Sequence, residues 1–260
     1  MSLLSRIVER PLRRAGYELA PRPDPARLQR SHPDLDDAGF GEAYVRCAAF
    51  TMTSVERMYA LWQAIEHVHR HGVRGDVVEC GVWRGGSSML AALALARVGD
   101  HERELWLFDT FSGMPAPGDH DAALGGEPIK QRWHEHDGRL DDAVFAYGSL
   151  DEVQSNMRAT GHPPARLHFV PGKVEDTLAG SGVGEIAVLR LDTDWYESTL
   201  AELEWGWPRL QANGVLIIDD YGHWVGARRA VDEFFAGRAD APLLTRSDYT
   251  GRLAVKLPPA

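Results

Sequence analysis

Short apolar runs recur along this 260-residue chain, and segments with helical spacing separate them. The runs cover 77–80, 105–109, 167–170, 186–191, 215–218 and 253–257, and the helical segments cover about 55–72, 87–98, 198–207 and 225–235. Strands that are apolar on both faces and alternate with helices form a parallel sheet with helices on both sides. The sequence therefore predicts one doubly wound α/β domain.

The first fifty residues differ from the rest of the chain. Arginines interrupt the apolar side chains of residues 3–14, and prolines recur within residues 21–40. We predict an N-terminal helical arm over 1–50, which either packs on its own protein or docks on a membrane surface or a partner subunit. The main domain is predicted over 51–260, and its first helix is predicted to begin at a capping box of Thr53 and Glu56.

The charge balance and the cysteines exclude some classes of protein. The chain has 28 Lys and Arg against 38 Asp and Glu, a formal net charge of -10, whereas broad nucleic-acid binding needs clustered positive charge. No apolar stretch reaches the roughly 18 residues that a membrane span needs. Two cysteines, Cys47 and Cys80, do not make a disulfide framework. We expect a cytoplasmic protein with no nucleic-acid partner and no membrane span.

Glycines and acids follow the first two predicted strands, where sheets of this class bind ligands. Glu79 precedes Gly81 and Gly86, which allow a tight turn and the close approach of a ligand. Asp109 ends the second strand, where a carboxylate can accept both hydroxyls of a ribose. The dinucleotide spacing G-x-G-x-x-G fails, because Trp83 takes the middle position. An amine, a carboxylate and a ribose match S-adenosylmethionine, and a packing role for the glycines is the alternative.

Four carboxylates follow the fourth and fifth predicted strands: Asp192, Asp194, Asp219 and Asp220. If these strands are neighbours, the carboxylates converge at one edge of the sheet, and their repulsion opposes ionisation. A hard divalent cation relieves that repulsion, and ligands that offer only oxygen favour Mg²⁺ or Ca²⁺. The alternative for Asp219 and Asp220 is a solvated turn or a helix cap. Two acidic pairs at adjacent strand ends favour the metal.

Several histidines and aromatic residues are weaker candidates. His67 and His71 share a helix face, which is more typical of cations at a helix carboxyl end than of a zinc site. His223 follows the second acidic pair closely enough to reach a metal or a substrate there. The other candidates are either substrate contacts or ordinary loop and core residues: His120, His134 and His136 in the polar stretch 111–148, and Trp195, Tyr196 and Trp224 near the carboxylates.

Five segments together resemble a known family. They are T-M-T-S-V-E-R at 51–57, V-E-C-G-V-W-R-G-G-S-S at 78–88, F-D-T-F-S-G-M-P at 108–115, L-R-L-D-T-D-W-Y-E-S-T at 189–199, and V-L-I-I-D-D-Y-G-H-W-x-G-A-R-R-A-V-D-E-F-F at 215–235. The chain resembles the macrocin O-methyltransferase family (TylF/MycF type) over roughly 50–257. Members of that family depend on S-adenosylmethionine and Mg²⁺, and several methylate sugar hydroxyls on antibiotics.

The resemblance implies a fold, a reaction and a set of site residues. The fold would be the seven-stranded, mostly parallel sheet of class I methyltransferases, and the acceptor would be a deoxysugar on a natural product. We expect a homo-oligomer on separate grounds, because dimers are the commonest soluble oligomers and the N-terminal extension can build an interface. Asp192, Asp219 and Asp220 would bind Mg²⁺, and Asp194 would be the general base. The cofactor would contact Met52, Thr53, Ser54, Glu79, Gly81, Ser87, Asp109, Ser112, Gly113, Gly172, Glu175 and Asp176.

The expected reaction is an in-line displacement at the sulfonium methyl group. An alcohol has a pKa near that of water, about 15.7, so a metal that lowers this pKa and a base that takes the proton are both needed. Three other readings stay open at this point: a nicotinamide-dependent oxidoreductase, a phenol O-methyltransferase of the catechol type, and a scaffold protein without activity.

Overall fold

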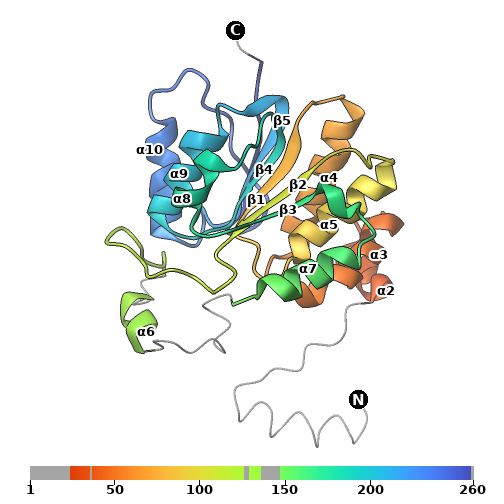
Figure 1. Ribbon diagram of the computed structural model, residues 1–260, viewed down its shortest axis with the longest axis horizontal. Helices are drawn as coiled ribbons and strands as arrows, with labels where there is room; N and C mark the ends of the chain where they lie inside the picture. The colour runs from red at the N-terminus through yellow and green to blue at the C-terminus, as the bar shows by residue number, and fades with distance from the viewer. Residues whose placement is uncertain (1–23, 36, 126–128, 136–146, 259–260) are drawn as a thin grey trace, which may run out of the picture.

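A computed structural model describes residues 24–258 apart from 36, 126–128 and 136–146 (Figure 1). Its centre is a seven-stranded sheet in the order β3-β2-β1-β4-β5-β7-β6. The strands are β1 (Asp76–Cys80), β2 (Leu105–Asp109), β3 (Leu167–Pro171), β4 (Ile186–Leu191), β5 (Leu210–Ile218), β6 (Thr245–Arg246) and β7 (Arg252–Val255). The first five strands in that order pair in parallel, and β7 pairs antiparallel with both β5 and β6. The predicted doubly wound, mostly parallel, seven-stranded sheet is confirmed.

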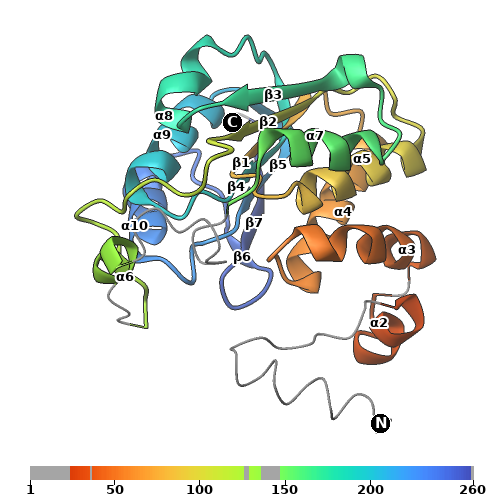
Figure 2. The same cartoon turned by 60° about the horizontal axis from the view of Figure 1, so that its bottom comes forward.

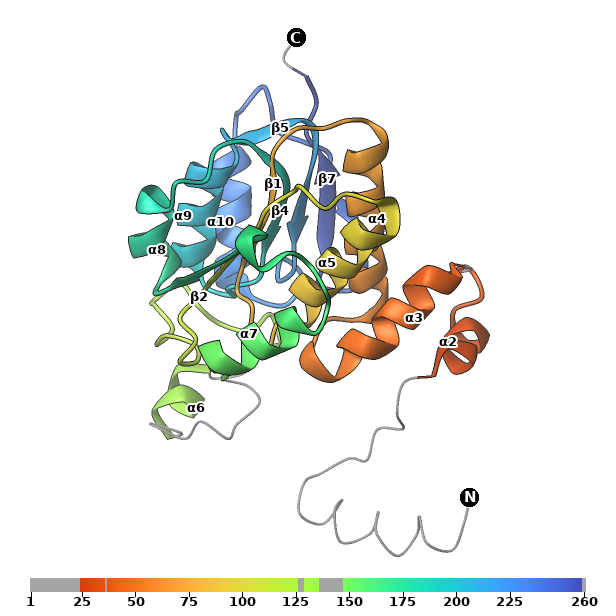
Figure 3. The same ribbon diagram turned by 45° about the vertical axis from the view of Figure 1, so that its right-hand side comes forward.

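Helices cover both faces of the sheet (Figures 1 and 3). One face carries α4 and α5, with α3 and α7 beside them, and the other carries α8, α9 and α10. Their bounds are α2 (Pro25–Ser31), α3 (Ala38–Cys47), α4 (Val55–Arg70), α5 (Gly86–Val98), α6 (Ile129–Glu135), α7 (Leu150–Arg158), α8 (Val174–Thr177), α9 (Tyr196–Gly206) and α10 (Val225–Phe235). Among the described residues, no helix has the length and apolar character needed to cross a membrane.

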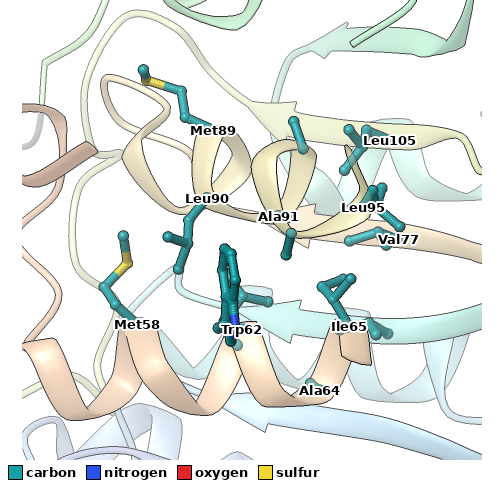
Figure 4. Close-up of a cluster of buried hydrophobic side chains, with 14 of the residues drawn as sticks. Met58, Trp62, Ala64, Ile65, Val77, Met89, Leu90, Ala91, Leu95 and Leu105 are labelled. Atoms are coloured by element: carbon teal, nitrogen blue, oxygen red, sulfur yellow. The ribbon is translucent and has the colours of Figure 1, made fainter. Parts of the chain in front are cut away.

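The helical periodicity of α4 produces the main core on its face of the sheet. Met58, Trp62 and Ile65 point from α4 toward Leu90 of α5 and Val77 of β1 (Figure 4), and all five side chains are buried. Burying side chains of this size stabilises a fold by about 1.5–3 kcal/mol each. This packing fixes α4 and α5 against β1, and so fixes the loops that leave their ends.

The segment before α4 contributes to the same core. Phe40 of α3 is fully buried and contacts the ring of Trp62 edge-on, and α3 lies beside α4 (Figure 2). Asp37 caps α3 and also accepts a hydrogen bond from the Trp62 indole N–H at 3.1 Å. Of the N-terminal helical arm predicted over 1–50, residues 1–23 lie outside the described residues, and the described part contains α2 and α3.

Two local predictions differ from the structure. The N-cap of α4 is Ser54, whose hydroxyl accepts the Arg57 N–H, so the predicted capping box at Thr53 is wrong by one residue. Thr53 accepts a hydrogen bond from Arg190 instead. Within the polar stretch that was expected to be irregular, residues 129–135 form helix α6.

Candidate functional site

A cavity of about 410 Å³ opens at the carboxyl ends of β1, β2, β4 and β5. The sheet order reverses between β1 and β4, and ligands bind beside such a switch point in open α/β sheets. Twelve of the predicted site residues line the cavity: Met52, Thr53, Gly81, Ser87, Asp109, Gly113, Gly172, Glu175, Asp192, Asp194, Asp219 and Asp220. Ser54, Glu79, Ser112 and Asp176 are not among its lining residues.

The glycine loop, residues 81–85, forms one wall of the cavity. Gly81 has φ +83°, and a Cβ on it would lie 1.9 Å from the carbonyl oxygen of Asp192, so no side chain fits there. Gly85 has φ +89° and is the N-cap of α5. Ser87 in the first turn of α5 lines the cavity beside this loop, and the free N–H groups of a first helical turn favour a negative ligand group.

Asp109 holds the glycine loop in place. Its Oδ2 accepts the N–H groups of Val82 at 2.6 Å and Trp83 at 3.0 Å, and its Oδ1 accepts the Phe111 N–H at 2.7 Å. Burial raises the pKa of this carboxyl, and the three N–H groups oppose the rise. Asp109 lies on the cavity wall, as a ribose partner must, but most of its acceptor positions already serve the backbone.

Glu79 lies beneath the glycine loop. Its side chain is buried, and it accepts hydrogen bonds from Ser87 Oγ at 2.5 Å, from Ser88 and from Arg190 Nη1 at 2.5 Å. Burial raises the pKa of Glu79, and Arg190 opposes the rise. Glu79 therefore contacts the cavity wall indirectly, through Ser87 on one side and through Arg190 on the other.

Three carboxylates meet at the other wall of the cavity, and we call them the three-carboxylate cluster: Asp192, Asp194 and Asp220. One oxygen from each lies within 4.8 Å of the others. Asp192 and Asp194 follow β4 and Asp220 follows β5, and these two strands are paired neighbours. The convergence expected from the sequence is therefore present for these three residues.

The cluster is costly to ionise without a cation. Burial raises the pKa of Asp194 to about 7, with Asp192 adding to the rise and hydrogen bonding from Asp220 and Trp224 opposing it. Burial, followed by the charges of Asp194 and Asp192, raises the pKa of Asp220 well above its ordinary value. Asp194 also has φ +67°, in the left-handed region that side chains with a Cβ rarely adopt. Asp194 therefore combines crowding by neighbouring carboxylates with a strained backbone conformation.

Asp219 is held by two arginines. Arg190 Nη2 donates to its Oδ1 at 2.7 Å, and Arg57 Nη1 donates to its Oδ2. Arg57 also pairs with Asp248 at 3.0 Å, and Arg190 pairs with Asp192 at 2.8 Å. Asp219 therefore lies on the cavity wall but apart from the three-carboxylate cluster. Its predicted role as a metal ligand stays a prediction.

Arg57 and Arg190 were absent from the predicted site, although the sequence carries a signal for one of them. Arg190 interrupts the apolar run 186–191, and every residue of β4 is buried. A charged residue in such a strand needs partners, because burying an unpaired charge is costly. Burial disfavours the charged form of Arg190, but Asp192 and Glu79 outweigh burial and raise its pKa.

Aromatic side chains and a methionine flank the mouth of the cavity. His223 and Trp224 line it, and so do Met52 and Tyr249, whose side chains are 54% and 59% exposed. Tyr249 Oη lies 3.3 Å from His223 Nδ1. Asp248 holds the loop of Tyr249 by accepting the N–H groups of residues 250 and 251. This exposed tyrosine was not predicted from the sequence.

The other weak candidates lie away from the cavity. Trp195 is buried against Trp224, and Tyr196, His120 and His134 are not lining residues. His67 contacts the carbonyl of Asn213 and the ring of His71, and among the described residues neither joins a group that could hold a metal. His136 lies outside the described residues.

A segment after β2, residues 118–124, is fixed to the starts of α9 and α10. Asp121 is buried and accepts the N–H groups of Tyr196 at 2.9 Å and Gly118 at 2.6 Å. The Val225 N–H donates to Ala122, and the Leu124 N–H donates to His223, each at 2.8 Å. Further along, Gly148 abuts the glycine loop, since a Cβ on it would lie 2.2 Å from the Trp83 carbonyl oxygen.

The profile of the macrocin O-methyltransferase family (TylF) matches residues 21–253. The chain belongs to the macrocin O-methyltransferase family. The family predicted from the sequence is thereby confirmed, and the chain is an O-methyltransferase of the kind that acts in antibiotic biosynthesis.

Two O-methyltransferases of known activity are similar in sequence to this macrocin-type enzyme. The 8-demethyl-8-(2,3-dimethoxy-alpha-L-rhamnosyl)-tetracenomycin-C 4'-O-methyltransferase of Streptomyces olivaceus is 39% identical over 211 residues, which are 81% of this chain and 72% of that protein. The mycinamicin III 3''-O-methyltransferase of Micromonospora griseorubida is 36% identical over 181 residues, 70% of this chain and 68% of that protein.

Solved structures of methyltransferases share the fold. The O-methyltransferase NovP aligns with a TM-score of 0.69 at 33% identity, over 80% of this chain and 83% of that chain. The calicheamicin methyltransferase CalS11 aligns with a TM-score of 0.62 at 18% identity, over 98% of this chain and 93% of that chain. The macrocin-type sheet described above is thus the class I methyltransferase sheet.

Proposed function

We propose that this enzyme transfers a methyl group from S-adenosylmethionine to a sugar hydroxyl of a natural product, with Mg²⁺ at the three-carboxylate cluster. The observation that carries the proposal is the position of this cluster, which shares one cavity with the glycine loop. A methyl donor and an activated alcohol must meet within one site. The wall formed by the glycine loop offers a place for the donor, and the wall with the three-carboxylate cluster offers a place for the alcohol.

The chemistry of the glycine loop fits the methyl donor. Its tight turn leaves the cavity open beside the first turn of α5, where N–H groups suit the carboxylate of the methionine part. Asp109, Gly172 and Glu175 line the same cavity beyond the loop, toward β2 and β3. Two solved structures that share this fold hold S-adenosylhomocysteine: an O-methyltransferase from Bacillus cereus and the methyltransferase PaMTH1 from Podospora anserina.

The chemistry of the three-carboxylate cluster fits Mg²⁺. All its ligand atoms are carboxylate oxygens, and Mg²⁺ is usually bound through one or two carboxylates together with water and substrate oxygens. We propose that Asp192 and Asp220 are those ligands. Asp219 would have to leave Arg57 and Arg190 to join them. When bound, the ion would supply Lewis-acid chemistry that lowers the pKa of an alcohol.

Asp194 is the proposed general base. A general base must lie within reach of the proton that it takes, and Asp194 belongs to the same three-carboxylate cluster as the two proposed ligands. Burial raises the pKa of Asp194 to about 7, and a cation held by Asp192 and Asp220 would lower it, so that the carboxylate would be ionised and able to accept a proton. The acceptor oxygen forms its bond to the methyl carbon while the carbon–sulfur bond breaks toward sulfur, and the hydroxyl proton passes to Asp194. A carboxylate oxygen of Asp194 lies within 4.8 Å of oxygens of Asp192 and Asp220, so an alcohol bound at the proposed metal would lie close to Asp194.

The mouth of the cavity suits a sugar carried by a larger molecule. Met52, Trp224 and Tyr249 offer apolar and aromatic surface, and His223 and Tyr249 offer polar atoms. Two relatives act on a rhamnosyl tetracenomycin and on mycinamicin III. We propose a deoxysugar on a natural product as the acceptor. The predictions of a homo-oligomer and of a cytoplasmic location stay predictions.

One assay tests the donor, the metal and the acceptor together. Release of S-adenosylhomocysteine is measured with an aryl rhamnoside, with its aglycone and with catechol, each in Mg²⁺ and in excess chelator. We expect turnover of the rhamnoside in Mg²⁺ alone. Full activity in chelator contradicts the metal role, and preference for catechol or the aglycone contradicts the sugar acceptor. A thermal shift with a nicotinamide dinucleotide but not with S-adenosylhomocysteine would favour the oxidoreductase.

A further inference from the structure

Arg190 is buried at the centre of the site and contacts four segments of the chain. Its side chain is 3% exposed, in a strand whose residues are all buried. Besides Glu79, its guanidinium donates to Thr53 Oγ1 at 2.9 Å and pairs with Asp192 and Asp219. The planar guanidinium fork can serve several acceptors at once, whereas an ammonium group is a single point charge.

These contacts make a continuous path between the two halves of the site. Asp192 of the three-carboxylate cluster lies 2.8 Å from Arg190 Nη2, and Arg190 Nη1 lies 2.5 Å from Glu79 Oε1. The same Glu79 oxygen accepts a hydrogen bond from the Ser87 hydroxyl at 2.5 Å. Ser87 lies in the first turn of α5, on the cavity wall where we propose that the methyl donor binds. Arg190, Glu79 and Ser87 are buried, and Asp192 is 27% exposed where it lines the cavity.

The single positive charge of Arg190 is thus shared by the carboxylates of Glu79, Asp192 and Asp219. A cation that takes the charge of Asp192 leaves the guanidinium to Glu79 and Asp219 alone, so the Arg190–Glu79 pair tightens. A tighter pair fixes Glu79, and with it the Ser87 hydroxyl and the start of α5. A ligand that binds an ordered wall loses less conformational entropy on binding, and its affinity rises.

We infer that Arg190 is a positioning residue that couples the methyl-donor site to the metal site. The inference rests on the proposed function, because it needs both sites to bind their ligands. Binding at each site strengthens binding at the other by the same factor, as linkage requires. The demethylated product S-adenosylhomocysteine is the better probe, because it lacks the sulfonium charge that a divalent cation would repel directly.

The test is a binding cycle without turnover. Calorimetry gives the Kd of S-adenosylhomocysteine in Mg²⁺ and in chelator, and electron paramagnetic resonance gives the Kd of Mn²⁺ with and without S-adenosylhomocysteine. For the unaltered enzyme we expect both affinities to rise at least about fivefold, the lower end of ordinary allosteric coupling. In Arg190→Lys we expect the coupling to fall below about twofold, because one ammonium cannot hold Glu79 and Asp192 together.

Arg103 offers a matched control. Its side chain is 10% exposed, it pairs with Asp100 at 3.1 Å, and it donates to the carbonyls of Val73 and Gly75 at the opposite end of β1. Arg103→Lys therefore loses comparable structural contacts, and its coupling should match that of the unaltered enzyme. Loss of coupling in both variants would mean a general effect of destabilisation and would overturn the inference.

A second variant keeps the test decisive if Arg190→Lys fails to fold. Glu79→Gln keeps the shape of the buried side chain and removes the charge that Arg190 holds, so it should lose the coupling as well. Unchanged coupling in a folded Glu79→Gln, or independent binding of the two ligands to the unaltered enzyme, overturns the inference alone. Failure of the unaltered enzyme to bind S-adenosylhomocysteine at all instead contradicts the proposed function.

Discussion

Gly81→Ala tests the contact between the glycine loop and the backbone of Asp192. The added Cβ would lie 1.9 Å from the Asp192 carbonyl oxygen, and real contacts essentially never fall below 3.0 Å. The two backbones must therefore separate by about 1.1 Å, the difference between these distances. The left-handed φ of +83° costs alanine about 1–2 kcal/mol, and overpacking adds about 1–3 kcal/mol.

Gly99→Ala separates the two costs. Gly99 ends α5 with φ +77°, but a Cβ there has no atom within 4 Å among the described residues. Gly99→Ala should lose only the backbone cost, so urea unfolding should show Gly81→Ala less stable by about 1–3 kcal/mol. Displacing Asp192 by about an ångström should also lower turnover by about 100-fold in Gly81→Ala alone. Equal stability losses in the two variants would refute the reasoning.

The remaining predictions concern single side chains of the site. Asp220→Asn should lower Mn²⁺ affinity more than about tenfold, whereas Asp219→Asn should change it less than threefold, because Asp219 is held by arginines. The reverse order, measured by titration with Mn²⁺, would restore Asp219 as a ligand. Asp194→Asn should lower kcat by about 100-fold or more with S-adenosylhomocysteine still bound, and near-normal turnover would assign the base elsewhere. Tyr249→Ala should raise the KM for the acceptor and leave the KM for S-adenosylmethionine unchanged, and a change confined to the latter would move Tyr249 to the donor side.

Much of the fold follows from local patterns in the sequence. The apolar runs around Val78 and Leu189 mark buried parallel strands, and the spacing of Met58, Trp62 and Ile65 marks the buried face of α4. These patterns were sufficient to predict the strands and the helix, because the residues that are buried in a fold are mostly apolar. Helix α7 was not predicted, although Ser149 and Glu152 have capping-box spacing and the Glu152 N–H does donate to Ser149.

The site was predictable only in outline, because partner choice depends on three-dimensional proximity. The sequence places Asp192, Asp194, Asp219 and Asp220 at neighbouring strand ends. It does not show that Arg57 and Arg190 both bind Asp219, or that Arg190 also pairs with Asp192. Arg57 comes from α4, far away along the chain, and its pairing with Asp219 depends on how α4 packs. The same holds for Tyr249, which a loop near the end of the chain brings to the cavity mouth.

Two fixed points, Asp121 and Gly148, bracket the stretch between the cavity and α7. Asp121 bonds to the first residue of α9, and Gly148 lies against the Trp83 carbonyl. Neither contact involves a side chain from residues 122–147, but Ala123 and Ile129 of that interval are buried in one cluster with Trp195 and Trp224, and Ala123 pairs with Trp224. A replacement segment would therefore leave the reactive edge of the sheet in place only if it kept that packing. Exchange between these two junctions, with Ala123 and Ile129 kept, is a route to new acceptors on an unchanged catalytic frame.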